Sequence, residues 1–185
     1  MREGGGAVVP LALASNWTKF MVIYSIGHSN HPPGIFLQLL QAQGIEVVAD
    51  LRSRPYSRFV PHFNRDALAK LLREAGIRYL YLGKELGGKP KDPERSLADE
   101  VVWKYLKSRP QFQEGLTRLL QEARQARVCV LCAEADPARC HRSQLIAPEL
   151  EARGARVKHI LPDGVILDHQ KLTMPTKKPS QKRLF

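Results

Sequence analysis

The chain has 185 residues, of which 43% are hydrophobic and 25% charged. It is long enough to bury a core without disulfides or structural metal, and this composition excludes collagen-like, disordered and disulfide-scaffold proteins. The formal charge of +11 favours a polyanionic partner such as nucleic acid, although a basic surface can also serve solubility alone. No apolar run approaches the ~18 residues of a membrane span, so we expect no membrane partner.

The first 20 residues are expected to form a flexible extension. Their one apolar run, 7–14, is interrupted by Pro10 and is at the lower length limit for a signal peptide. The chain carries three cysteines close together, Cys129, Cys132 and Cys140. An odd number in such a cluster is not a secreted disulfide framework, which predicts a reduced, cytoplasmic setting.

Beyond residue 20, apolar β-branched runs alternate with helical patterns. The expected strands are 21–26, 46–51, 77–82, 127–132, 156–161 and a short segment at 165–168. The expected helices are 32–43, 64–75, 96–107, 110–125 and 137–153. This order predicts one α/β domain over residues 21–168, with a mostly parallel sheet of about five strands and helices on both faces. Residues 169–185 are expected to form a flexible basic tail.

Local signals set the helix ends. Glycines at 44, 76 and 154 follow three of the helices as C-terminal stops. Asp136 and Pro137 have the form of an N-cap and first residue of the last helix. The segment 83–95 is too long for a simple connection, and loops of this length are usually functional or mobile.

Chemically active side chains follow three strands at the point where each ends. In a parallel sheet these ends share one edge, where ligands bind. The candidate site residues are His28, Asp50, Arg52, Arg58, Cys132, Glu134, Cys140, His141 and Arg142.

Most of these residues have two possible roles. The arginines suit a phosphate or carboxylate, but they can equally pair with Asp50 and Glu134. Asp50 can act as a base or orient a neighbouring Arg or His. His28 is a candidate general acid or base, or a loop histidine bonded to backbone.

Cys132 ends a buried strand, where it is either a small core residue or a nucleophile. A following helix N-terminus and nearby arginines would lower the pKa of its thiol. Cys140 is predicted in the first turn of that helix and is subject to the same field. The spacing of Cys132, Cys140 and His141 matches no standard zinc motif, so we expect no metal and no other cofactor.

The motifs at these positions resemble a known family. GHS at 27–29, DLRSRPYSR at 50–58, LGG at 86–88 and CAEADPARCHRSQLIA at 132–147 are similar to those of the domain-of-unknown-function family 488. The resemblance covers about 23–159 and implies that the candidate residues form one pocket. It implies no particular reaction.

A weaker resemblance is to rhodanese-like sulfurtransferases and cysteine phosphatases. It rests on Asp50-x-Arg52 after one strand and on Cys132 ending another, before an Arg-containing loop. Glu134 and Asp136 depart from that pattern, because an acidic loop repels the anion that those enzymes cradle.

The last five residues, QKRLF, resemble the pentapeptide with which bacterial polymerases and repair proteins bind the replication sliding clamp. A flexible tail could place Leu184 and Phe185 in an apolar pocket while Gln181 hydrogen bonds at its rim. A basic tail folded back on the domain is the alternative.

Together these features lead to one hypothesis and two alternatives. The protein is expected to act on or beside DNA, in repair or nucleic-acid processing. Arg52, Arg58 and Arg142 would bind a phosphate-bearing group, and His28, Asp50 and Glu134 would supply acid–base chemistry. The alternatives are a sulfurtransferase or phosphatase-like enzyme with Cys132 as nucleophile, and a ligand-sensing adaptor without catalysis.

Overall fold

The structure is a computed structural model that describes residues 21–89 and 99–172. The expected N-terminal extension and the clamp-like pentapeptide lie outside the described residues. In the described part, no helix is both long and apolar enough to cross a membrane.

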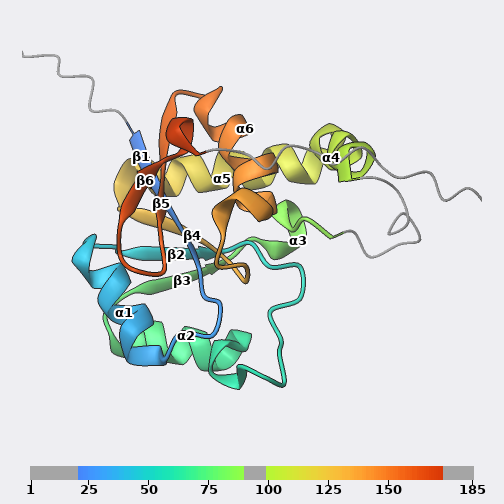
Figure 1. The fold of residues 1–185 in the computed structure, drawn as a ribbon. Coiled ribbons are helices and arrows are strands. Elements are labelled where there is room, and N and C mark those ends of the chain that lie inside the picture. Colours follow the sequence, from blue (N-terminus) through green and yellow to red (C-terminus); the bar gives the residue numbers. More distant parts are fainter. Residues whose placement is uncertain (1–20, 90–98, 173–185) are drawn as a thin grey trace, which may run out of the picture.

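One mostly parallel sheet forms the centre of the domain (Figure 1). Its strands are β1 (Met21–Gly27), β2 (Val47–Asp50), β3 (Arg78–Tyr81), β4 (Val128–Cys132), β5 (Ala155–Ile160) and β6 (Ile166–Asp168). They lie in the order β3-β2-β4-β1-β5-β6, and only β6 runs antiparallel, against β5. The expected α/β class is confirmed, with six strands rather than about five, because the short final segment pairs with β5.

Helices cover both faces of this sheet (Figure 1). They are α1 (Pro33–Ala42), α2 (Arg65–Glu74), α3 (Gly83–Leu86), α4 (Asp99–Ser108), α5 (Pro110–Gln125) and α6 (Ala147–Glu151). Helices α1 and α2 bury Phe36 and Leu68 against one face, whereas α5 buries Phe112 and Leu116 against the other. Helix α3 was not expected, since it lies inside the segment predicted as a loop.

The chain order places a switch point between β1 and β4. From β1 the chain crosses to β2 and β3 on one side, and from β4 it crosses to β5 on the other. Ligands of doubly wound sheets bind in the crevice that opens at such a point. The ends of these two strands, at Gly27 and Cys132, are register partners.

The segment after β4 corrects the prediction of one continuous helix. Asp136 caps the first turn as expected, accepting a hydrogen bond from the amide of Ala138. That turn is a 3-10 turn that ends at Arg139, and the backbone is extended at Cys140. A π-helical turn, Arg142–Ile146, then leads into α6. Cys140 therefore lies between helical segments and not in the first turn of a helix.

The fold also runs past residue 168, where the tail was expected to begin. A 3-10 turn, His169–Lys171, follows β6. His169 is buried, and its Nδ1 lies 3.0 Å from Nε2 of His159, which is itself hydrogen bonded to Ser25. These buried contacts attach residues 169–171 to β5.

Candidate functional site

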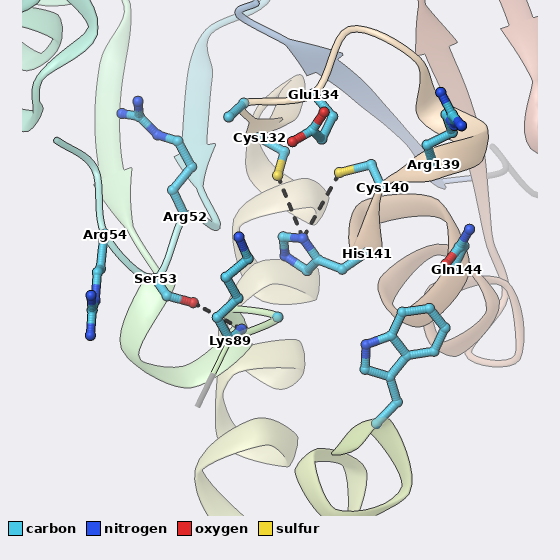
Figure 2. Close-up of a pocket in the computed structure, with 13 residues that line it drawn as sticks. Arg52, Ser53, Arg54, Lys89, Cys132, Glu134, Arg139, Cys140, His141 and Gln144 are labelled. Atoms are coloured by element: carbon cyan, nitrogen blue, oxygen red, sulfur yellow. Dashed lines mark hydrogen bonds between the residues drawn. The ribbon is translucent and has the colours of Figure 1, made fainter. Parts of the chain in front are cut away.

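A pocket of about 600 Å³ opens at the carboxyl edge of the sheet (Figure 2). Its walls come from the loop after β2, the end of α3, helix α4 and the segment after β4. The lining residues are Arg52, Ser53, Arg54, Gly88, Lys89, Trp103, Cys132, Ala133, Glu134, Arg139, Cys140, His141 and Gln144. The pocket lies at the edge that the strand-end rule predicts, and five of the nine candidate residues line it.

Arg52 is the most constrained cation of the pocket. It is 7% exposed and paired with the fully buried Asp50, whose two carboxylate oxygens accept from Nε and Nη2 at 2.9 and 2.6 Å. The backbone amide of Arg52 and the hydroxyl of Tyr79 donate to the same carboxylate. Asp50 is therefore occupied in orienting Arg52, which leaves it unsuited to the catalytic base role.

His28 completes this network from the other side. Its Nδ1 donates to the carbonyl of Ser29 at 2.8 Å, so its Nε2 is an acceptor and receives Nη1 of Arg52 at 3.0 Å. The ring stacks on Phe63. Burial, and then the charge of Arg52, lower the pKa of His28 to about 4. Its contacts make His28 a neutral support for Arg52 and not a general acid at neutral pH.

Two predicted anion-binding arginines lie away from the pocket surface. Arg142 is 1% exposed and points inward, donating to the carbonyls of Glu134 and Ala135 at 2.6 and 3.1 Å. It shapes the loop after β4 instead of binding a ligand. Arg58 is exposed and lies over the ring of Phe59. Although Arg58 is near Arg52 in sequence, it does not line the pocket.

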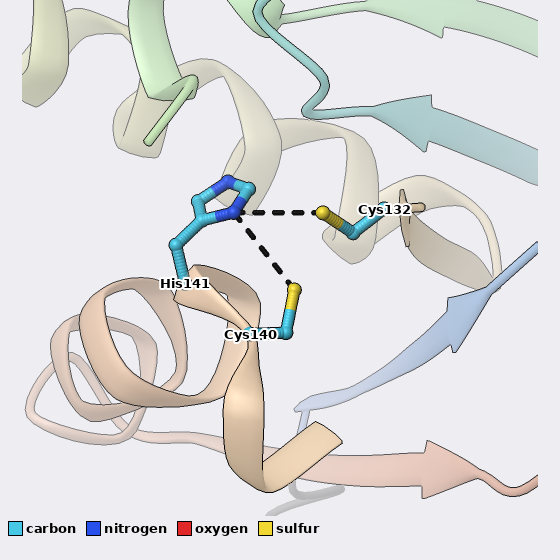
Figure 3. Close-up of side chains that lie close together, drawn as sticks. All are labelled: Cys132, Cys140 and His141. Carbon is cyan, nitrogen blue, oxygen red and sulfur yellow. Dashed lines mark hydrogen bonds between the residues drawn. The ribbon is translucent and has the colours of Figure 1, made fainter. Parts of the chain in front are cut away.

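Cys132, Cys140 and His141 come together at the pocket (Figure 3). Nδ1 of His141 lies 3.5 Å from Sγ of Cys132 and 3.9 Å from Sγ of Cys140. All three atoms are within 4.8 Å of one another. The break in the helix at Cys140 permits this grouping, because it turns residues 140 and 141 toward the end of β4.

The two thiols differ in their acidity. A hydrogen bond from Cys140 is the largest of several effects that lower the pKa of Cys132 to about 7, against the opposing effect of burial. The charge of Arg142 and the amides of Ala133 and Glu134 act in the same direction. The pKa of Cys140 is raised to about 12 by the same bond and by burial. The expected acidification of Cys140 is therefore wrong.

Cys129 has a different environment from the other two cysteines. It is fully buried in β4 and packs in the core on the α1 and α2 side of the sheet, and burial raises the pKa of its thiol. Cys129 is therefore a small core residue.

Two glycines of the family-like motifs are required by close approaches. A Cβ at Gly27 would collide with the backbone carbonyl of Glu134, so only glycine lets the loop after β4 cross the end of β1. A Cβ at Gly88 would lie 2.6 Å from Cγ of His141. Gly88 therefore packs directly on the imidazole and fixes its place.

Eight of the thirteen lining residues were not among the candidates, and Lys89 and Trp103 are two of them. Lys89 follows α3, and its amide donates to Oγ of Ser53. Its only advance signal was the length of the segment 83–95. Trp103 lies on α4, where nothing in the local sequence separates a pocket-facing tryptophan from a core residue.

Comparison with known families gives one match. Residues 34–147, more than half of the chain, match the domain of unknown function DUF488. The chain is a DUF488 protein. No curated protein and no solved structure matches it. The DUF488 match spans the segments that supply Arg52, Lys89 and the group of Cys132, Cys140 and His141, but it begins after His28.

Proposed function

We propose that the pocket binds a phosphate-bearing group and that the protein acts in nucleic-acid processing, with DNA repair as the leading setting. Four lining side chains are cationic: Arg52, Arg54, Lys89 and Arg139. Among the described lining residues the one acid is Glu134. Basic side chains flank the centre of the pocket from both sides (Figure 2). This excess of positive charge suits a polyanion.

The state of Arg52 is the observation that carries the proposal. A guanidinium has five N–H donors in a fixed fork. Asp50 and His28 take three of them, one each at Nε, Nη2 and Nη1. Within the described part of the chain the other two, one on each terminal nitrogen, have no assigned protein partner. Such a pre-oriented pair of donors matches two oxygens of one phosphate, and little side-chain entropy is lost on binding.

Pyrophosphate binding, followed by calorimetry on the full chain, tests the pocket. Arg54→Ala and Arg139→Ala remove exposed cations from its rim, so we expect weaker binding without loss of the fold. Each change should also make the affinity for pyrophosphate less sensitive to salt, because one screened charge–charge attraction is lost. Arg58→Ala is the matched control, because Arg58 is exposed on the same loop as Arg54 but outside the pocket. Equal effects of Arg54→Ala and Arg58→Ala would refute a pocket-bound phosphate.

A labelled oligonucleotide, competed with pyrophosphate, tests the nucleic-acid part. Competition that Arg139→Ala weakens is the expected result. Oligonucleotide binding that pyrophosphate does not displace would assign the nucleic acid to another surface. Binding without any turnover of the oligonucleotide would favour the ligand-sensing adaptor.

The cysteine-dependent alternative has one favourable observation. Cys132 lines the pocket beside amides that point at its sulfur. It predicts that Cys132→Ser abolishes turnover of thiosulfate or of a phosphate monoester while leaving the fold intact. The contacts of the Cys132 sulfur argue against this alternative. The sulfur lies in a group with a second thiol and an imidazole, whereas the nucleophile of such an enzyme faces an open anion-binding loop.

The tail enters this proposal as a recruitment element. Gln181, Leu184 and Phe185 lie outside the described residues, and binding to the sliding clamp stays a prediction from the sequence. Its failure would leave the pocket proposal unchanged, since the two rest on different parts of the chain.

A further inference from the structure

We propose that Cys132, Cys140 and His141 form a binding site for one divalent transition metal ion of the Zn²⁺ class. The ligands are the two sulfurs and Nδ1 of His141 (Figure 3). This reverses the expectation from sequence spacing. Standard zinc motifs take ligand pairs from local turns, whereas here a strand end and a helix break meet in space.

The distances fit a tetrahedral ion. With Zn–S of about 2.3 Å and Zn–N of about 2.05 Å, tetrahedral angles place sulfur and nitrogen about 3.6 Å apart. The observed separations from Nδ1 are 3.5 Å to Cys132 and 3.9 Å to Cys140. The sulfur-to-sulfur distance for the same geometry is about 3.8 Å, and the observed atoms lie within 4.8 Å of one another. Shifts of a few tenths of an ångström in the sulfur–nitrogen distances, and at most about 1 Å between the sulfurs, complete the site.

The surroundings of the site support metal-bound thiolates. Amides of Ala133 and Glu134 hydrogen bond to the sulfur of Cys132, and the buried charge of Arg142 lies nearby. Outer contacts of this kind orient metal ligands and moderate their charge. Two thiolates and one neutral imidazole balance a divalent cation, so the ion would add no excess charge to a partly buried site.

The geometry also determines the orientation of the imidazole. Gly88 packs against the Cβ side of the ring, and Nδ1 faces both sulfurs. Nε2 is buried without a protein partner among the described residues. Metal binding at Nδ1 leaves the ring proton on Nε2, at the pocket wall, where a bound ligand or water can accept it.

Three protein ligands leave a fourth position open. Because all three ligand residues line the pocket, that position faces the same cavity as Arg52 and Lys89. An open Cys₂His site is the pattern of a catalytic zinc and not of a closed structural one. A metal there could hold a phosphate oxygen or a water beside the cationic wall. This last use rests on the proposed function, whereas metal binding itself does not.

Cobalt titration of the full chain tests the site. The protein is stripped with a chelator, kept reduced with a phosphine and titrated with Co²⁺, which substitutes for Zn²⁺. We expect one equivalent to produce a thiolate-to-cobalt charge-transfer band and the intense visible bands of tetrahedral Co²⁺. One equivalent of Zn²⁺ should then abolish both.

The variants identify the ligands. Cys132→Ser, Cys140→Ser and His141→Gln should each weaken Zn²⁺ binding by more than about 100-fold, since loss of an outer-shell contact alone costs about 10–100-fold. Cys129→Ala is the matched control, because Cys129 lies in the same strand but faces the core, and it should keep the full signal. Circular dichroism of each stripped variant separates loss of the ligand from loss of the fold.

The outcomes separate this inference from the phosphate proposal. Absence of a thiolate–cobalt band, or its persistence at unchanged Co²⁺ affinity in Cys140→Ser and His141→Gln, would overturn the metal site. Metal binding without pyrophosphate binding would leave the metal site standing and refute the phosphate pocket. If stripped protein binds pyrophosphate but takes up no metal, the phosphate pocket stands and the metal site is refuted.

Discussion

The ion pair between Arg52 and Asp50 gives the sharpest stability prediction. Its shortest contact is 2.6 Å, with side chains 7% and 0% exposed. Arg78 and Glu122 make a pair of the same length, but their side chains are 60% and 24% exposed. The two pairs differ in burial and in the number of hydrogen bonds that the carboxylate accepts, four for Asp50 and one for Glu122, so both effects favour a larger loss at Asp50.

Asp50→Asn should therefore be far more damaging than Glu122→Gln. The substitution removes the charge that balances buried Arg52 and turns an acceptor into a donor that faces N–H and O–H groups. Breaking a buried pair in this way costs about 3–5 kcal/mol, whereas an exposed pair contributes about 0–1 kcal/mol. Because a whole domain is stable by only about 5–15 kcal/mol, Asp50→Asn removes a large share.

Urea unfolding, followed by circular dichroism, measures both variants. The expected result is a large drop in midpoint for Asp50→Asn and a small one for Glu122→Gln, with similar slopes. A loss from Asp50→Asn of under about 1 kcal/mol, the value for an exposed pair, would refute the reasoning. It would show that Arg52 finds solvent when its partner is lost, and the pre-oriented donors would no longer support phosphate binding.

Three further predictions concern other parts of the chain. Gly27→Ala should prevent stable folding, because the added Cβ would meet a backbone carbonyl. Gly34→Ala, in the exposed first turn of α1, should be neutral or stabilising by up to about 1 kcal/mol. Equal melting temperatures for the two variants would contradict this prediction. Burial lowers the pKa of His159 to about 3. Between pH 3 and 6.5 the unfolded chain therefore binds more protons than the folded chain. The contribution of His159 to the free energy of unfolding is complete above pH 6.5 and decreases as the pH falls. His159 alone contributes about 2 kcal/mol of the loss at pH 5. Urea midpoints that fall equally in wild type and His159→Gln would count against it. Finally, the intact chain should bind a bacterial sliding clamp in a pull-down and a version ending at Ser180 should not; equal capture of both would remove the tail from the functional proposal.

The sequence by itself determined the order of elements and the edge that carries the site. Alternating apolar runs and helical patterns are local signals, since they depend on which side chains follow one another along the chain. The cap at Asp136 and the stop at Gly44, whose φ is +60°, were read in the same way and are observed. The rule that parallel strands end at one edge then placed Arg52 and Cys132 together without any knowledge of contacts.

Only the tertiary structure decided what each candidate side chain does. In sequence, Arg52 and Arg142 are both arginines in a loop or turn. In the structure Arg52 lines the pocket, whereas Arg142 donates to backbone carbonyls. The difference arises from which groups the fold leaves unpaired in its interior, because a buried donor must find an acceptor. Which acceptor a buried donor finds depends on the packing of the whole chain and not on the residues next to it in sequence.

The cluster of Cys132, Cys140 and His141 shows the same division. Its spacing resembles no local metal motif, and the expectation of a regular helix placed Cys140 in the wrong environment. The observed backbone is extended at Cys140, and a π-helical turn follows. Metal ligands need only meet within a few ångströms in space, so a break in one helix, packed against the end of one strand, can create a site that no linear pattern records.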